Sequence, residues 1–278
     1  ARLATRSDSG PAGAARMPRW VARIADLRDA ALIFVVVMLA WEAAARAGLF
    51  PAYVLPAPSA IAHRLAQTAG LLGAHMLVTA GEIIGGFAIA LVIGVLLAAA
   101  IVCVPFVERA VYPWLVVVQV IPKVALGPLL IIWLGFGVFP KVLIAFLLAF
   151  FPIMIDTMVG MQSVDRDAVF LMRSMGAGRT RIFVNLRLPH ALPHLFGSLK
   201  VAITLATAGA IVGEFIGADR GLGYVLIFAN GSMDTTLMFA ALAWISALAL
   251  VFYALVSLAE KVFLHWHVSQ RKEGGERA

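Results

Sequence analysis

The stretch SVDRDAVFLMRSMGAGRTRIFVNLRLPHALP, residues 163–193, interrupts a chain that otherwise consists of long apolar runs. It carries five arginines, and two aspartates stand at its start. Apolar residues recur in its first half at positions that fall on one face of a helix: Val164, Ala168, Leu171, Met172 and Met175. The stretch therefore predicts an amphipathic helix with a basic surface, lying outside the lipid.

The ends of this helix are also predicted by local signals. Ser163 is a plausible N-cap, and Asp165 and Asp167 favour the positive end of the helix dipole. Gly176 and Gly178 are expected to end the helix, because glycine tolerates a left-handed backbone. A second short helix follows, with Ile182, Phe183 and Leu186 on one face, and Pro189 and Pro193 are expected to stop it.

Two interpretations of residues 163–193 remain open at this point. The first is an ordinary loop, basic only because cytoplasmic loops of membrane proteins are basic. The second is a docking element for another protein, built from two short helices and a glycine elbow.

The composition places the whole chain in a membrane. Of 278 residues, 62% are hydrophobic and 13% are charged, whereas soluble domains are about half apolar and about a quarter charged. The formal charge of +7 gathers at the two ends and in residues 163–193, so a nucleic-acid groove is not expected. Cys103 is the single cysteine, which excludes an internal disulfide.

The sequence offers no catalytic or metal-binding pattern. It has no Cys/His cluster with zinc spacing, no Walker lysine motif and no Ser/His/Asp set. Neither catalytic residues nor metal ligands are expected, and any ATP hydrolysis is expected on another chain.

Six apolar runs are long enough to cross a bilayer, which takes about 20 residues. The predicted fold is therefore an all-α membrane protein with six transmembrane helices, at about residues 29–48, 77–104, 107–134, 139–161, 195–216 and 236–263. Flanking them we expect a flexible arm at residues 1–28 and a polar tail at residues 266–278, with the membrane domain at 29–265. The first run could instead be a signal peptide, but Trp41 and Glu42 near its end favour an uncleaved helix.

Two irregular segments are expected within this pattern. The third run is interrupted at Ile121, Pro122 and Lys123, which predicts a kink facing protein or water. Residues 217–234 predict a polar re-entry between the last two spans.

Lysine and arginine set the expected orientation. With the N-terminus inside, seventeen of these residues fall on inner segments and four on outer ones: Arg46, Arg64, Lys141 and Arg220. Such an excess marks the cytoplasmic side. We therefore expect both termini and residues 163–193 in the cytoplasm.

Polar side chains inside the spans are candidates for a translocation pathway, because such groups are costly in lipid. The candidates are Glu82, Gln119, Lys123, Trp133, Asp156, Thr207 and Glu214. Each has a plainer alternative. Glu82 and Glu214 could be interfacial carboxylates, Asp156 a contact between helices, Lys123 a snorkelling charge, and Trp133 an interface anchor.

The stretch quoted first resembles the EAA loop of ABC importer permeases. Gly176 is followed ten positions later by Leu186, and Leu188-Pro189 completes the pattern. The name-giving Glu-Ala-Ala positions hold Phe170-Leu171-Met172 instead.

Further strings resemble the nitrate, sulfonate, taurine and thiamine-precursor branch of type I permeases. They lie at about residues 50–265 and include Pro122–Leu129, Trp133–Gly137, Phe151-Pro152-Ile153, and Glu214 with Gly221-Leu222-Gly223.

Membership of this family would imply a permease dimer, expected to be a homodimer, in the bacterial cytoplasmic (inner) membrane and in contact with its lipid. Its expected partners are two ATPase subunits, which would bind the ATP and Mg²⁺, and an external substrate-binding protein, periplasmic or lipid-anchored. No cofactor on this chain and no nucleic acid are implied. The residues that would couple to the ATPase are Leu171, Met172, Met175, Gly176, Ala177, Gly178, Arg179, Leu188 and Pro189.

The resemblance also suggests a substrate class. The string Ala210–Phe215 is closer to permeases for thiamine-pyrimidine precursors or riboflavin. Glu82, expected near the entrance, would suit a neutral or amine-bearing heterocycle better than a small anion. The alternative substrates are sulfonates, taurine or nitrate.

Two other classes of protein compete with this interpretation. An ion-coupled secondary transporter would need no ATPase partner. An intramembrane enzyme would need paired catalytic groups, and all six histidines fall outside the predicted spans or at their ends.

Overall fold

The computed structural model describes the backbone of residues 19–264 and side chains from Arg28 onwards. Most of the predicted arm, residues 1–18, and the whole predicted tail, 266–278, lie outside the described residues. The chain divides into two units, residues 1–60 and 61–278, and each is described by itself.

The first unit contains helix α1 (Arg19–Arg46), which begins inside the segment predicted as an arm. At its end Glu42 accepts hydrogen bonds from the backbone N–H of Ser59 at 3.0 Å and from its hydroxyl at 2.7 Å. Glu42 also pairs with Arg46 at 2.6 Å. These contacts fix the loop between α1 and the start of the next helix.

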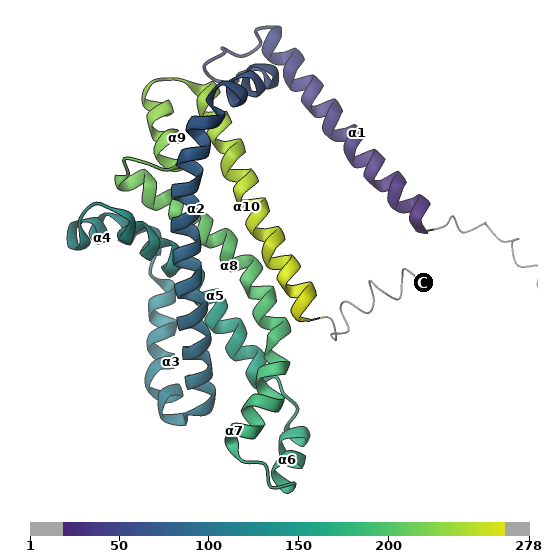
Figure 1. The fold of residues 1–278 in the computed structure, drawn as a ribbon, viewed down its shortest axis with the longest axis vertical. Helices are drawn as coiled ribbons and strands as arrows, with labels where there is room; N and C mark the ends of the chain where they lie inside the picture. Colours follow the sequence, from purple (N-terminus) through teal and green to yellow (C-terminus); the bar gives the residue numbers. More distant parts are fainter. Residues whose placement is uncertain (1–18, 265–278) are drawn as a thin grey trace, which may run out of the picture. The chain divides into compact units, whose positions relative to one another are not determined.

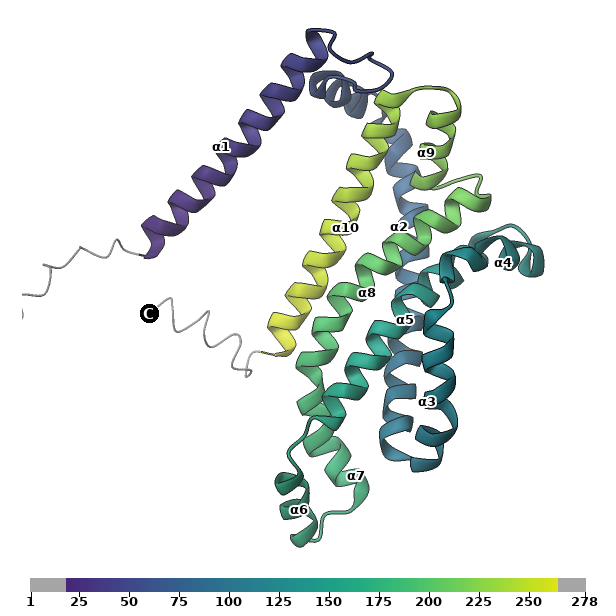
Figure 2. The same cartoon turned by 180° about the vertical axis from the view of Figure 1, so that it is seen from behind.

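The second unit is helical throughout its described residues and is shown from two sides in Figures 1 and 2. Its elements are α2 (Pro58–Cys103, beginning in the first unit), α3 (Pro105–Val120), η1 (Lys123–Leu126), α4 (Gly127–Leu134), α5 (Val138–Gln162), α6 (Arg166–Ser174), α7 (Arg179–Ile182), η2 (Phe183–Arg187), α8 (Leu188–Gly217), α9 (Leu222–Gly231) and α10 (Thr235–Phe263).

The centre of this unit is a close crossing of α2, α5 and α8 around Ala145. A Cβ added at Gly209 of α8 would lie 2.7 Å from the Ala145 Cα, and one at Gly86 of α2 would lie 2.5 Å from the Ala145 Cβ. Small residues let helix backbones approach closely where lipid gives no hydrophobic drive for association. The tight crossing therefore depends on glycines in two helices that face one alanine in the third.

The membrane spans of the described residues follow from helix length and hydropathy. Within residues 19–264, four helical stretches are long and apolar enough to cross a bilayer: α2, α5, Arg179–Gly217 and α10. The pair α3 and η1–α4 would make a fifth if it is one broken span. The first predicted span, in α1, is not among them, so the count of six stays a prediction.

The predicted break at residues 121–123 is confirmed, and the chain turns there by 85°. Ile121 and Pro122 both have extended backbones. For Ile121 the cause is steric, because a proline disfavours the helical conformation of the residue before it. The second predicted span was too short, since α2 is continuous from Pro58. The polar re-entry contains a helix of its own, α9.

Two prolines do not act as predicted. Pro189 and Pro193 do not stop the helix after the elbow, because α7, the π-helical η2 and α8 run on without a loop. Pro189 occupies the first turn of α8, where a missing N–H costs little. The extra residue per turn in η2 is a known way for a helix to absorb such a disturbance.

Candidate functional site

The elbow predicted from the sequence is present between α6 and α7. Its glycine, Gly176, has φ +79°. The N–H of Gly176 donates to the Arg173 carbonyl at 2.9 Å, and the N–H of Ala177 donates to the Met172 carbonyl at 3.0 Å. These two bonds form a Schellman motif, which needs a left-handed residue at the position of Gly176. The chain direction at the elbow is therefore set by this one glycine.

The start of α6 differs from the prediction in one residue. Asp165, not Ser163, is the N-cap: its side chain accepts a hydrogen bond from the N–H of Asp167 at 2.9 Å. Ser163 instead donates to the Gly160 carbonyl at 3.0 Å at the end of α5. An ionised cap at a helix N-terminus is stabilised by the dipole as well as by the hydrogen bond.

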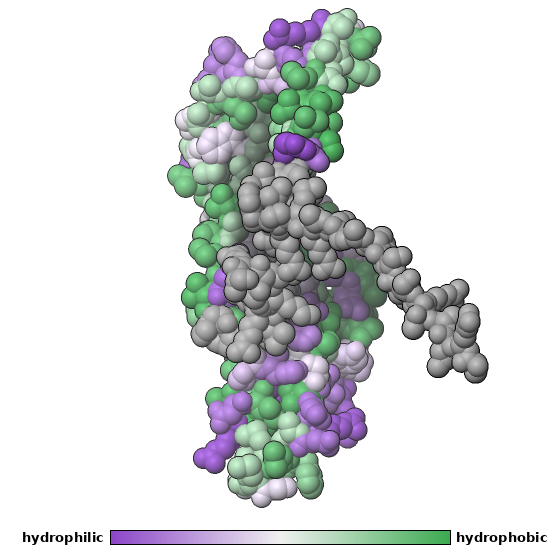
Figure 3. Space-filling view, turned by 90° about the vertical axis from the view of Figure 1, so that its right-hand side faces the viewer, coloured by the Kyte–Doolittle hydropathy of each residue, from purple (hydrophilic) through white to green (hydrophobic). Residues whose placement is uncertain are grey.

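The elbow exposes large apolar side chains. Phe170 is 72% exposed, Leu171 61% and Met175 77%, and we call these three residues the elbow surface. The end of the molecule that carries α6 and α7 shows hydrophobic patches beside hydrophilic ones in Figure 3. A contiguous apolar patch with a charged rim is typical of a protein–protein contact.

The other predicted coupling residues fall into two groups. Gly176, Gly178 and Arg179 are exposed at the elbow, whereas Met172 and Ala177 are half-buried. Leu188 and Pro189 are half-buried in the first turn of α8, away from the elbow surface.

Arg187 ties the elbow region to the end of α2. Its guanidinium donates to the Val102 carbonyl at 3.2 Å. That carbonyl belongs to the last turn of α2, where a positive charge also interacts favourably with the helix dipole. This hydrogen bond joins η2 to the end of α2.

At the opposite end of α8 the structure assembles a buried polar cluster that was not predicted as a unit. The exposed fractions are 0% for Glu82, 3% for Lys141 and 2% for Glu214. Lys141 Nζ donates to Glu82 Oε1 at 2.9 Å. We call these three residues together with Thr79 the buried cluster.

The buried cluster holds the start of α9. Thr79 Oγ1 donates to Glu214 Oε1 at 2.6 Å and accepts from the Leu222 N–H at 2.9 Å. The Gly223 N–H donates to Glu214 Oε2. Nearby, the Gly221 N–H donates to His75 Nδ1 at 3.0 Å. The first N–H groups of a helix have no partner within the helix, and here side chains of α2 and α8 supply the acceptors.

These contacts correct three expectations. Glu82 and Glu214 are not interfacial carboxylates, since both are buried among α2, α5 and α8. Glu82 does not stand at an entrance, so its charge no longer argues for a substrate class. Lys141 was counted only as an outer positive charge, although its place in a long apolar run was a signal for a buried partner.

The remaining pathway candidates do not join the buried cluster. Lys123 donates to the Gln119 carbonyl at 2.5 Å and lies 4.5 Å from the centre of the Phe151 ring. Trp133 is exposed. Thr207 is buried and donates to the Ile203 carbonyl of its own helix at 2.9 Å.

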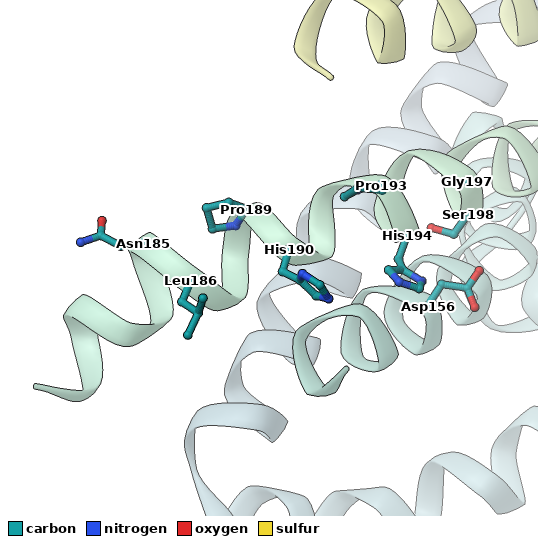
Figure 4. A pocket seen from close by; sticks show the side chains of 9 residues that line it. All are labelled: Asp156, Asn185, Leu186, Pro189, His190, Pro193, His194, Gly197 and Ser198. Carbon is teal, nitrogen blue, oxygen red and sulfur yellow. The ribbon is translucent and has the colours of Figure 1, made fainter. Parts of the chain in front are cut away.

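Asp156 lines a separate open pocket of about 800 Å³ between α5 and α8, shown in Figure 4. His194 lies beside it in this view, and His190 and Ser198 line the same wall. Asp156 is exposed on α5 and faces His194 of α8 across this pocket, so the predicted contact between helices stays a prediction. Within the described residues no group of three His, Cys, Asp or Glu side chains is arranged to hold a metal ion.

Together the fold and the elbow define a polytopic helical membrane protein with exposed apolar side chains at the turn between α6 and α7. The chain belongs to the family described as the binding-protein-dependent transport system inner membrane component, whose model matches residues 90–265. It is a permease of the type I ABC importers, from the branch with taurine, sulfonate and thiamine-precursor permeases. ATP hydrolysis in such systems belongs to a separate subunit.

Three relatives illustrate the similarity. The riboflavin transport system permease protein of Chloroflexus aurantiacus is 38% identical over 84% of this chain and 88% of its own length. The formylaminopyrimidine transport permease protein of Halalkalibacterium halodurans is 36% identical over 86% and 96%. The taurine transport system permease protein of Escherichia coli is 25% identical over 84% and 87%.

Proposed function

We propose that this permease imports a nitrogen heterocycle of the riboflavin or pyrimidine-precursor type. The observation that supports this substrate class is the difference in identity, 38% and 36% to the riboflavin and formylaminopyrimidine permeases against 25% to the taurine permease. The family implies a complex with an ATPase and a substrate-binding protein. We further propose that the complex contains two copies of this chain, in contact with membrane lipid.

The elbow is proposed as the site that receives the force of ATP hydrolysis. Its exposed side chains, Phe170, Leu171 and Met175, would pack into a groove of the ATPase and bury apolar surface there. Arg173, Arg179 and Arg181 of the same segment are exposed, and their positive charges would favour a groove with an acidic rim. Closure of the two ATPases would then move the elbows, and α8 would carry the motion into the membrane.

Uptake into proteoliposomes tests the substrate class. The permease would be reconstituted with its own ATPase and binding protein, and labelled riboflavin, formylaminopyrimidine and taurine would be compared. We expect ATP-dependent uptake of one of the two heterocycles and none of taurine. Uptake of taurine alone would contradict the substrate class, and uptake without ATP would favour the ion-coupled secondary transporter.

The orientation gives a second test. In a Cys103→Ser background, Met175→Cys at the elbow and Asp219→Cys beyond α8 both place a thiol on an exposed residue. We expect a membrane-impermeant maleimide to label the Met175→Cys variant in inside-out vesicles and the Asp219→Cys variant in intact spheroplasts. The reverse pattern would place the elbow outside the cell and would exclude its contact with a cytoplasmic ATPase.

A further inference from the structure

The buried cluster carries unbalanced charge in the ordinary ionisation states of its residues. Glu82 and Glu214 would contribute two negative charges and Lys141 one positive charge, in a space that is nearly closed to solvent. An uncompensated charge in such a place is strongly unfavourable, and it is usually removed by a partner or by a proton.

The surrounding groups do not supply a second cation. His75 uses Nδ1 as an acceptor for the Gly221 N–H, which is possible only for the neutral imidazole. Arg220 and Asp219 are largely exposed and lie 4.0 Å apart, so they compensate each other in solvent. Among the described residues, Lys141 is the only cation that forms an ion pair with either carboxylate, at 2.9 Å from Glu82 Oε1.

One atom of the cluster lacks a donor. Glu214 accepts a hydrogen bond on each oxygen, from Thr79 and from the Gly223 N–H. Glu82 accepts from Lys141 on Oε1, whereas its Oε2 is buried without a hydrogen-bond donor. Thr79 and Glu82 lie three residues apart on α2 and therefore on one face of it, so the hydrogen bond from Thr79 to Glu214 brings the Glu214 carboxyl beside that of Glu82. Two carboxylates only accept, so a bond between them requires a proton on one of them.

We propose that the buried cluster binds one proton from solvent, held on Glu82 Oε2 and donated to the Glu214 carboxylate. The charges that remain are then the Lys141 ammonium and the Glu214 carboxylate, which balance. Glu82 Oε2, the one oxygen of the two side chains without a hydrogen-bond partner, then has one. Because Glu214 also holds the first turn of α9, the bound proton is part of the attachment of that helix.

Infrared spectroscopy of the complete transporter in lipid nanodiscs tests this proposal. A protonated carboxylic acid has a carbonyl stretch distinct from that of a carboxylate, and exposed carboxyl groups are ionised at neutral pH. We expect the acid band at neutral pH in the wild type, its loss in Glu82→Gln, and its retention in the control Glu108→Gln, which changes an exposed carboxylate of α3. Absence of the band in the wild type would overturn the proposal.

The midpoint of thermal unfolding distinguishes a protonated Glu82 from an ionised Glu82 that has only a structural role. An amide at position 82 keeps a donor where the protonated acid has one, so Glu82→Gln should keep the wild-type midpoint. Glu214→Gln should lower it, because the amide places a donor against the donors that Glu214 accepts from. Survival of the acid band in Glu82→Gln would show that the band comes from another carboxyl group, and failure of this variant to assemble would show that a neutral donor cannot replace Glu82; either result would contradict the proposal.

Discussion

Replacement of Gly176 by valine should uncouple ATP hydrolysis from uptake. Gly176 adopts φ +79° in the Schellman motif of the elbow, a region that a β-branched residue enters only at a cost of about 1–3 kcal/mol. A Cβ at this position meets no atom within 4 Å. The expected damage is therefore to the backbone direction of the elbow and not to packing inside the permease.

The size of the effect follows from that strain. Each 1.4 kcal/mol changes an equilibrium by about tenfold, so the docked conformation of the elbow should be populated about 5–150-fold less. The measurement is the number of ATP molecules hydrolysed per substrate molecule imported, and this ratio should rise steeply.

The control for this prediction is Gly48→Val. Gly48 has φ +69° and also meets no atom within 4 Å, so it carries similar strain outside the elbow. It should lower stability without changing the coupling ratio. An unchanged ratio in Gly176→Val would mean that the elbow does not transmit the force.

The largest loss of stability is expected from Gly221→Ala. Gly221 has φ +114°, and a Cβ there would overlap the carboxylate of Glu214. Glu214 is 2% exposed and accepts from both Thr79 and Gly223. The methyl group would therefore displace a buried charge from its donors, which leaves polar groups unsatisfied at about 1–3 kcal/mol each, and more for a charged group.

Accumulation in the membrane and the thermal midpoint of the purified permease measure this effect. We expect Gly221→Ala to accumulate poorly or to unfold at a clearly lower temperature. Gly231→Ala is the matched control, because it lies at the other end of α9 with no atom within 4 Å of the added Cβ. Equal stability of the two variants would show that the contacts of Glu214 do not anchor α9.

The elbow was predictable from sequence because its signals are local. Periodic apolar residues, two aspartates and a glycine all act within a few turns of helix, and Gly176 has the role that its position indicates. The errors there are small: the cap is Asp165, and Pro189 does not end the helix. Local rules predict that a proline ends a helix, but they do not show that the π-helical η2 lets the helix continue through Pro189.

The buried cluster was not predictable in the same way. Glu82 and Glu214 were selected singly, as costly residues in apolar runs. Their partners Thr79 and Lys141 come from α2 and α5, and only the packing of three helices brings them together. A charge count treats Lys141 only as a positive charge at the end of a span, and it does not reveal that the side chain is buried against Glu82.

The continuous helical stretch Arg179–Gly217, made of α7, η2 and α8, has 39 residues. At about 1.5 Å per residue its length is about 58 Å. The elbow lies at one end of this helix and Glu214 lies near the other. A tilt of only about 5° at the lower end would sweep the far end through about 5 Å. Under the proposed docking at the elbow, a small movement there would therefore become a larger one at the end that contacts α9.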